Sequence, residues 1–235
     1  PLLLWQWIPA VGSVVKDHPD PSKNEAFFAP LVAYLHADAT PLARVEIPPT
    51  QDHWESLWGA ADLQLARGWE RQFDIAENGI FYGSDPLTAA SYDNWLLSNG
   101  VSWVALPTVN LDYSALQEAA LVKAGLPYLV PAWHDANWQL WRVVGSPGLI
   151  AGPAKLVAIG PNSFTVDAAG AGSISIRVRF TRFWTPTIGR ACITASPEGW
   201  TQLAVAGPGR VEVASKLIGG GDGCNPDGSA APISP

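Results

Sequence analysis

The chain contains no methionine, only two cysteines and few basic residues. Its 14 lysine and arginine residues stand against 21 acidic ones, which gives a net charge of −7 at pH 7. Nucleic acids and anionic membrane surfaces are bound through clustered Lys and Arg side chains. The charge therefore excludes a nucleic-acid partner, whereas a neutral or sugar-like partner remains compatible. Because the chain starts at Pro1 without a methionine, we expect it to be a fragment of a longer protein.

Long hydrophobic runs are also absent. The most apolar stretch, residues 2–15, contains Gln6, Pro9 and Gly12 and falls short of the roughly 20 residues that span a bilayer. It lacks the basic start and the small-residue cleavage site of a signal peptide. We therefore expect the cellular address to lie in sequence outside this chain.

Catalytic and metal-binding motifs are missing as well. The chain has no G-x-S-x-G, no H-E-x-x-H and no phosphate-binding glycine loop, which are the motifs of acyl transfer, zinc proteolysis and nucleotide binding. Cys192 and Cys224 lie outside any Cys/His cluster with zinc-ligand spacing. The sequence thus predicts no metal, no cofactor and no identifiable catalytic residue. The cysteine count alone leaves one disulfide and two free thiols equally open.

The first half of the chain alternates apolar runs with capped helical segments, which is typical of an α/β domain. Pro86 and Gly100 bracket a predicted helix over 87–99, because proline suits a first helical turn and glycine the residue after the last. Ser114 and Gln117 have capping-box spacing before a predicted helix over 115–123. The predicted strands are 43–47, 63–66, 80–82 and 101–106, with a closing hairpin of 128–133 and 138–144.

One further helix has an uncertain start. Ser22 and Glu25 have capping-box spacing, yet Pro30 would interrupt a helix that runs through it. We therefore predict a helix over 30–36. Together these elements predict a mixed, largely parallel sheet with flanking helices.

A β-rich unit is predicted after the Gly and Pro residues at 145–148, where helix signals vanish. Over 173–181, Ile174, Ile176, Val178 and Phe180 alternate with polar residues, which indicates a half-buried strand. Further strands are predicted at 155–159, 164–167, 200–205 and 211–214. We divide the chain into an α/β domain over 1–145, a small antiparallel β-sandwich-like domain over 146–216, and a Gly/Pro-rich tail over 217–235.

A dense polar and aromatic stretch at 66–74, with 53–55 upstream, is the candidate ligand-binding site. The residues in it whose side chains could bind a ligand are His53, Glu55, Arg67, Trp69, Glu70, Arg71 and Asp74. Carboxylates suit acid-base chemistry or hydroxyl binding, arginines suit a phosphate or carboxylate, and an indole offers a flat face to a sugar. Alternatively, the charges at 67, 70, 71 and 74 are three or four residues apart and pair along one face to brace a loop. We favour this structural interpretation.

Twelve tryptophans are many for 235 residues. Most fall in helix or strand runs and are predicted to be core, while four lie near loops or strand ends, namely Trp58, Trp69, Trp184 and Trp200. Arg177, Arg179 and Arg182 form a weak basic stripe, which we interpret as a solvated sheet face.

Several segments resemble a group of membrane proteins. They are HWE at 53–55, ARGWERQ at 66–72, FY at 81–82, VALP at 104–107 with LDYS at 111–114, and WQLWRV at 138–143. These segments are similar to the C-terminal extracytoplasmic region of actinobacterial polytopic membrane proteins that resemble the GT-C class of glycosyltransferases. The resemblance spans most of residues 1–215, and no motif in it is a known catalytic signature.

The resemblance implies an outer-face location, a polyprenyl-phosphate sugar donor for the whole protein, and a catalytic acid in a loop outside this chain. The chain would then be an accessory domain that scaffolds the enzyme or binds acceptor glycan, without catalysis of its own. Its expected partners are its own upstream transmembrane region and a glycan or polyprenyl-linked sugar. Because that location is oxidising, we expect Cys192 and Cys224 to form a disulfide that anchors the tail.

Two other functions stay open. A free-standing carbohydrate-active enzyme would use two of Glu55, Glu70 and Asp74, and requires two exposed carboxyls about 5–9.5 Å apart in one cleft. A cell-envelope protein-interaction module would instead require a sizeable exposed apolar patch.

Overall fold

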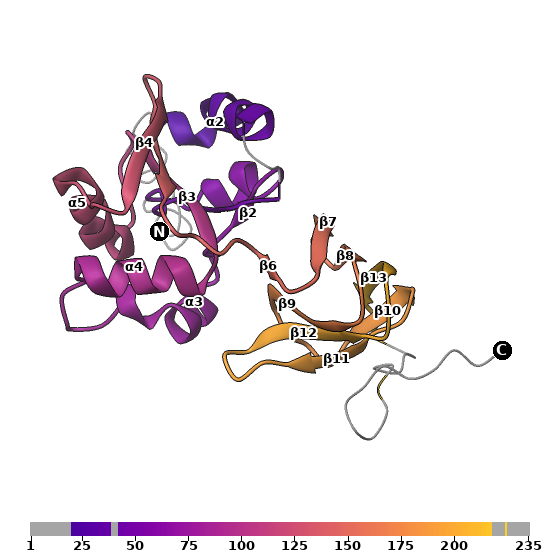
Figure 1. Ribbon diagram of the computed structural model, residues 1–235. Coiled ribbons are helices and arrows are strands. Elements are labelled where there is room, and N and C mark those ends of the chain that lie inside the picture. Colours follow the sequence, from indigo (N-terminus) through magenta and orange to yellow (C-terminus); the bar gives the residue numbers. More distant parts are fainter. Residues whose placement is uncertain (1–19, 39–41, 218–223, 225–235) are drawn as a thin grey trace, which may run out of the picture.

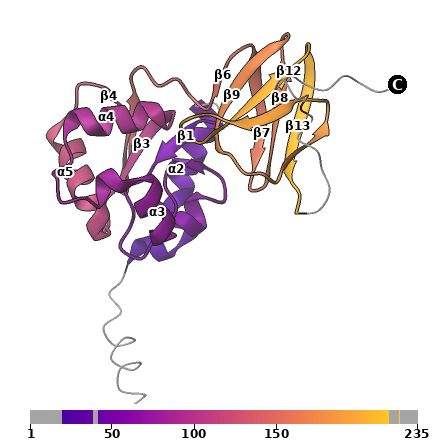
Figure 2. The same cartoon turned by 90° about the horizontal axis from the view of Figure 1, so that it is seen from below.

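The computed structural model describes residues 20–38, 42–217 and 224. Figures 1 and 2 show two units side by side, first a sheet with flanking helices and then a unit of strands only. The predicted combination of an α/β fold with antiparallel sheets is therefore observed in this coarse form. Residues 1–19 and most of the tail after 217 lie outside the described residues, so the predictions for them are not assessed.

The elements of the first unit, in chain order, are η1 (Pro21–Lys23), α2 (Glu25–Asp38), β1 (Arg44–Glu46), the π-helical turn η2 (Glu55–Gly59), β2 (Gln64–Leu65), α3 (Arg71–Glu77), η3 (Gly79–Phe81), α4 (Ala89–Ser98), β3 (Val101–Pro107), η4 (Tyr113–Ala115), α5 (Leu116–Ala124), β4 (Leu129–His134) and β5 (Trp138–Val143). Those of the second unit are β6 (Ile150–Ala151), β7 (Ala154–Gly160), β8 (Ser163–Ala168), β9 (Gly172–Arg179), β10 (Trp184–Ile188), β11 (Cys192–Ala195), β12 (Trp200–Val205) and β13 (Gly209–Ser215).

The sheet of the first unit has the strand order β2-β1-β3-β5-β4. β1 pairs in parallel with β2 and β3, whereas β5 pairs antiparallel with β3 and β4. The sheet is thus mixed, as predicted, but parallel pairing does not predominate in it. The predicted hairpin is the reason, because a short turn joins only antiparallel strands, and the hairpin supplies β4 and β5.

Helices cover both faces of this sheet. Side chains of β3 alternate, so that Trp103 and Ala105 pack with α2 while Val104 and Leu106 pack with α4 and α5. A strand buried on both faces has the continuous apolar composition that 101–106 shows. The placement of β3 at the centre of the sheet explains that composition.

α4 and α5 confirm the helices predicted at 87–99 and 115–123. Their N-terminal caps differ from the prediction. Thr88 and Ser91 form the capping box of α4, and the carboxylate of Asp112 accepts the Ser114 backbone N–H at the turn into α5. Gly100 ends α4 with φ +65°, in the region that favours glycine.

The predicted start of a helix at Pro30 is wrong, since α2 begins at Glu25 and continues through the proline. Phe27 and Phe28 precede the proline and are buried against Trp138, with ring centroids 5.0 and 5.4 Å away. The Trp138 indole also donates to the Phe27 carbonyl over 2.8 Å. This tertiary packing outweighs the hydrogen bond that proline removes from the helix.

Two local predictions near residue 80 also fail. The segment 80–82 was predicted as a strand but forms the 3-10 helix η3, and the helix α3 was not predicted. Phe81 is buried with its ring centroid 4.9 Å from that of Trp95. Its apolar character therefore reflects helix packing and not sheet pairing.

The second unit consists of two four-stranded antiparallel sheets, ordered β10-β13-β8-β7 and β11-β12-β9-β6. The predicted strands correspond to β7, β8, β9, β12 and β13, whereas β6, β10 and β11 were not predicted. Ile174 and Ile176 of β9 are fully buried in the core between the sheets, with Val178 and Phe180 packed at its edge. The predicted inward face of β9 is thus confirmed.

Contacts between the two units involve the outward face of β9. The Arg177 guanidinium donates to the Ser98 carbonyl over 3.1 Å and to the Gly148 carbonyl over 2.9 Å. In return, Arg44 of β1 donates to the Arg177 carbonyl over 2.5 Å. The interpretation of this arginine stripe as a solvated sheet face is therefore wrong for Arg177, which contacts the adjoining unit, whereas Arg179 and Arg182 are exposed.

No helix in the part of the chain that the structure describes is long and apolar enough to cross a membrane. Cys192 and Cys224, 32 positions apart, are joined in a disulfide, which is the pairing expected from the sequence. Cys192 opens β11, so the bond attaches the tail to the second sheet of the β unit.

Candidate functional site

Loops that follow the three parallel strands meet at the carboxyl ends of β1 and β3. Thr50 forms a β-bridge with Leu111, and the Asp112 N–H donates to the Pro49 carbonyl over 2.9 Å. The chain leaves β1 toward β2 and returns to β3 on the other side, which makes this a topological switch point where α/β folds commonly bind ligands. Here, however, the two loops pair with each other and close the gap.

Six of the seven sequence-predicted residues lie around these loops or the start of α3, in three different environments. Arg67 and Asp74 belong to a buried ionic cluster. His53, Glu55 and Arg71 belong to a partly exposed cluster, while Glu70 lines a cleft between the two units. The seventh residue, Trp69, is 59% exposed. The structure therefore does not gather them into one site.

Arg67 is the centre of the buried cluster. Its guanidinium lies 3.2 Å from Glu118, 3.1 Å from Asp74 and 3.6 Å from Glu46. The side chain is 2% exposed and stacks over the Phe81 ring with 3.9 Å to the centroid. Burial opposes its charge, but these carboxylates raise the pKa of Arg67 above its ordinary value. Arg67 is therefore a structural cation without access to a ligand.

Three carboxyl groups around one guanidinium leave an excess of negative charge in a buried space. Neither oxygen of Glu46 accepts a hydrogen bond from a donor in the described residues. Burial, and then the neighbouring Glu118, raise the pKa of Glu46 well above its usual range. Burial also raises the pKa of Glu118, whose Oε1 accepts from the Tyr92 hydroxyl over 2.6 Å. Burial and the neighbouring carboxylates therefore favour the neutral, protonated form of Glu46.

Asp74 connects this cluster to the surface. Its Oδ2 accepts from Arg67 and from the Tyr82 hydroxyl, and its Oδ1 accepts from the Asn78 amide over 2.8 Å. Asn78 in turn accepts from the Trp95 indole over 2.9 Å. Both Asp74 oxygens are thus occupied, which excludes this carboxylate as a free acid or base.

Arg71 and Asp112 dominate the partly exposed cluster. They form a bidentate ion pair with distances of 3.0 and 3.1 Å, and the Asp112 Oδ1 also accepts from Ser114. Although burial opposes it, hydrogen bonds from Arg71 and Ser114 lower the pKa of Asp112. The predicted pairing of Arg71 with Glu70 or Asp74 along one face is therefore not what the structure shows, although Arg67 does pair with Asp74 as predicted.

His53 lies beside this pair and has a left-handed backbone conformation with φ +59°, which is uncommon outside glycine. Its Nδ1 lies 3.1 Å from Glu55 and its Nε2 lies 3.3 Å from Arg71. The hydrogen bond with Glu55 raises the pKa of His53. Glu55 itself is buried and also accepts from Thr50, so its oxygens are engaged.

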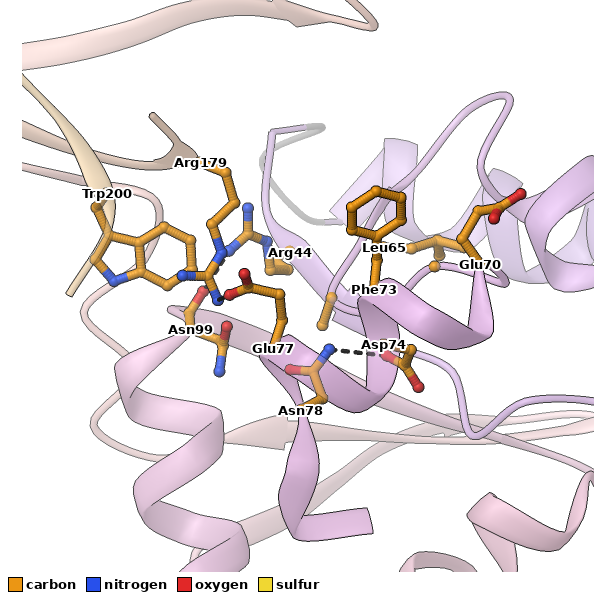
Figure 3. A pocket seen from close by; sticks show the side chains of 12 residues that line it. Arg44, Leu65, Glu70, Phe73, Asp74, Glu77, Asn78, Asn99, Arg179 and Trp200 are labelled. Atoms are coloured by element: carbon orange, nitrogen blue, oxygen red, sulfur yellow. Dashed lines mark hydrogen bonds and ion pairs between the residues drawn. The ribbon is translucent and has the colours of Figure 1, made fainter. Parts of the chain in front are cut away.

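A cleft of about 260 Å³ lies between the two units (Figure 3). One side comes from α3 and the residue before it, with Glu70, Phe73 and Glu77. The other side comes from Arg179 of β9 and Trp200 of β12. The Phe73 ring is 71% exposed. Figure 3 shows Phe73 and Trp200 at opposite ends with Glu77 between them. The cleft thus offers two aromatic rings separated by hydrogen-bonding groups.

Sequence reasoning missed the contribution of the β unit to this cleft. Arg179 lies over the Trp200 ring with 4.1 Å to the centroid and pairs with Glu77 over 2.6 Å. The available signal was the arginine stripe, which alternates with the buried side chains of β9 and has a tryptophan on the adjacent strand. A pattern within one strand does not reveal which surface will cover it.

What the cleft can do chemically follows from its residues. Guanidinium groups bind anions, carboxylates and amides bind hydroxyls, and aromatic rings cover apolar faces. Among the described residues, no group of three or more His, Cys, Asp or Glu side chains is arranged to hold a metal ion. No protein-family model matches this chain, and no curated protein and no solved structure is significantly similar to it.

Proposed function

We propose that this chain is an accessory extracytoplasmic domain of a membrane-embedded, glycosyltransferase-like protein, and that its interdomain cleft binds one sugar residue of an acceptor glycan. The domain positions the glycan and carries out no catalysis itself. Its partners are then the upstream transmembrane region of the same protein and a glycan or polyprenyl-linked sugar.

The cleft is the observation that carries this proposal. Ligand sites occur preferentially at domain interfaces, and drug-sized ligands occupy about 300–1,000 Å³. A cleft of about 260 Å³ is slightly smaller and suits a ligand the size of one sugar. Trp200 and Phe73 offer ring faces, while Glu70, Asn78 and Asn99 offer hydroxyl partners. This combination of aromatic faces and amide or carboxylate groups matches the apolar faces and hydroxyl edges of a pyranose.

The outer-face location has separate support. A disulfide between Cys192 and Cys224 is compatible with an oxidising compartment, where such bonds persist. The net charge of −7 disfavours contact with anionic lipid headgroups. An accessory domain of this kind would therefore lie outside the membrane, with its cleft open to the periplasm or cell wall.

The alternative of a free-standing carbohydrate-active enzyme has weaker support. It requires two exposed carboxyls in one cleft. Of the three candidates, Glu55 is 3% and Asp74 is 5% exposed, and both accept several hydrogen bonds. Of the predicted set only Glu70 is exposed in the cleft, and the other exposed carboxyl there, Glu77, is paired with Arg179 over 2.6 Å.

A protein-interaction role is favoured by a different observation. Trp69, Phe73 and Ile75 lie close together in the chain and are 59%, 71% and 46% exposed. Exposed apolar side chains that gather in one patch often mark a contact surface. Under the proposal, this segment would contact the membrane-embedded part of the protein. Phe73 would then belong both to that contact surface and to the wall of the cleft.

Titration of the full chain with a panel of neutral and acidic oligosaccharides, followed by tryptophan fluorescence and calorimetry, tests the proposed function. Trp200→Ala should weaken binding about tenfold or more, because burial of a large aromatic side chain contributes about 1.5–3 kcal/mol. Trp133→Ala is the matched control, since Trp133 lines a separate hollow of about 480 Å³ on the β4–β5 hairpin. Absence of binding to every oligosaccharide, or equal losses in both variants, would contradict the proposal.

A further inference from the structure

The charges at the Trp200 end of the cleft do not balance. Arg44, Arg177 and Arg179 lie close enough that the latter two lower the pKa of Arg44, after the larger effect of burial, to about 10. Glu77 is the carboxylate that pairs with this group, and it contacts Arg179. Three guanidinium groups therefore share one acid, and the excess positive charge lies at the wall of the cleft.

Arg44, unlike Arg179, has no acidic partner among the described residues. Its guanidinium donates to two backbone carbonyls, of Asn99 over 2.7 Å and of Arg177 over 2.5 Å. Its Nε is buried without an acceptor, and no ion pair to Arg44 is found within residues 20–38, 42–217 and 224. A buried cation is normally paired with an acid, because desolvation of an unpaired charge is costly. Arg44 lacks such an acid and lines the cleft.

The other acids of the cleft do not supply the missing charge. Asp74 also lines the cleft, but its oxygens are engaged with Arg67, Asn78 and Tyr82. Glu70 lies at the Phe73 end in Figure 3, away from Trp200 and Arg179. The cleft is thus polarised, with a cationic end beside Trp200 and an acidic, exposed end beside Phe73.

We infer that the cationic end of the cleft binds the anionic group of an acidic sugar residue, a carboxylate or a phosphate, between Arg44 and Arg179 while Trp200 lines the sugar. This inference rests on the proposed function and specifies its ligand. Guanidinium groups bind carboxylates and phosphates in charge-assisted pairs that are stronger than neutral hydrogen bonds. An anion here would supply the acid that Arg44 lacks and would compete with Glu77 for Arg179.

If these arginines only hold the two units together, substitutions should have different effects from those expected for an anion site. Arg177 already links the units through Ser98 and Gly148, and it uses carbonyl acceptors that need no further charge. The Arg179–Glu77 pair is 43% and 48% exposed, so it contributes little to stability. If Arg179 and Glu77 only join the units, loss of either side chain should have the same effect. If an anion binds Arg179, the two losses should have opposite effects.

The experiment is calorimetric titration of the full chain with glucose, glucuronate, glucose 6-phosphate and inorganic phosphate at low salt. We expect the acidic sugars to bind about tenfold more tightly than glucose, given the strength of hydrogen bonds to charged groups. Arg179→Gln should remove this preference. Glu77→Gln should strengthen binding of the acidic sugars, because it frees Arg179. Arg210→Gln, which breaks a comparable exposed pair with Asp167 on the same β unit, should change neither.

The outcomes separate the two proposals. Tighter binding of only glucuronate would identify a carboxylate as the bound anionic group, and tighter binding of only glucose 6-phosphate would identify a phosphate. Either result supports the inference. Equal affinity for glucose and both acidic sugars overturns the inference while the proposed function stands. A loss of affinity in both Arg179→Gln and Glu77→Gln overturns it in favour of a purely structural pair. Binding of phosphate alone as tightly as glucose 6-phosphate, or no saccharide binding at all, contradicts the sugar site itself.

Discussion

The guanidinium of Arg71 holds the carboxylate of Asp112 with two hydrogen bonds, 3.0 Å from Nη1 to Oδ1 and 3.1 Å from Nη2 to Oδ2. The two residues are 41 positions apart and connect the start of α3 to the loop after β3. Asp112 also caps the turn into α5 through the Ser114 N–H. One ion pair therefore fixes the relative positions of loops that follow β2 and β3.

Replacement of Arg71 by alanine should destabilise the protein by about 1–3 kcal/mol, because it leaves the largely buried Asp112 carboxylate without its cation. Urea denaturation at neutral pH measures this loss. Adding Asp112→Asn should recover part of it, since the stranded charge is then removed. A neutral or stabilising effect of Arg71→Ala would instead indicate that the pair is strained and awaits a ligand.

Stability should fall as the pH rises from about 5 to about 8. The pKa of Glu46 is raised above its unfolded value of 4.5, so its contribution is fully present below that pH and is lost as the pH rises through the folded pKa. The raised pKa of His53 acts in the same direction above 6.5. Melting temperatures across this range measure the slope.

Glu46→Gln separates the two contributions, because glutamine imitates a carboxyl that keeps its proton. The variant should flatten the pH dependence and should be more stable than the natural chain near pH 8. His53→Gln is the control and should remove only the part above pH 6.5. An unchanged slope in Glu46→Gln would contradict the raised pKa of Glu46.

The disulfide between Cys192 and Cys224 should hold the tail against the β unit. Thiol labelling of the unfolded, unreduced chain should detect no reactive cysteine. Cys192→Ser should lower stability by about 3–4 kcal/mol in the chain-entropy model, because the bond closes a loop over 32 positions. Two labelled thiols in the unreduced chain would rule out the bond.

Gly100→Ala should disturb the contact between the two units. A methyl group there would overlap the Gly148 carbonyl and approach Arg177 Cδ to 2.7 Å, in addition to the strain of φ +65°. Gly125→Ala is the matched control, since Gly125 has φ +87° but open space around it and should cost only the backbone strain of about 1–2 kcal/mol. Limited proteolysis near Gly148 should accelerate in the first variant alone.

Elements whose signals are local were predictable from the sequence. The helices α4 and α5 have capping residues within a few positions of their ends, and β9 shows its buried face through simple alternation. The predictions failed where distant packing decided the conformation. α2 continues through Pro30 because Phe27 and Phe28 pack on Trp138, and 80–82 is helical because Phe81 packs on Trp95.

The candidate site shows the same division. The residue types at 53–55 and 66–74 identified a charged region, since i to i+3 and i to i+4 spacing indicates possible partners on one helix face. The sequence by itself therefore determined which groups carry charge. Only the tertiary structure decided that Arg71 binds Asp112, that Arg67 is sealed among carboxylates, and that Arg179 and Trp200 complete a cleft. These contacts join residues tens of positions apart. Their energies depend on how far the folded chain excludes water from them, and a local sequence pattern carries no information on this exclusion.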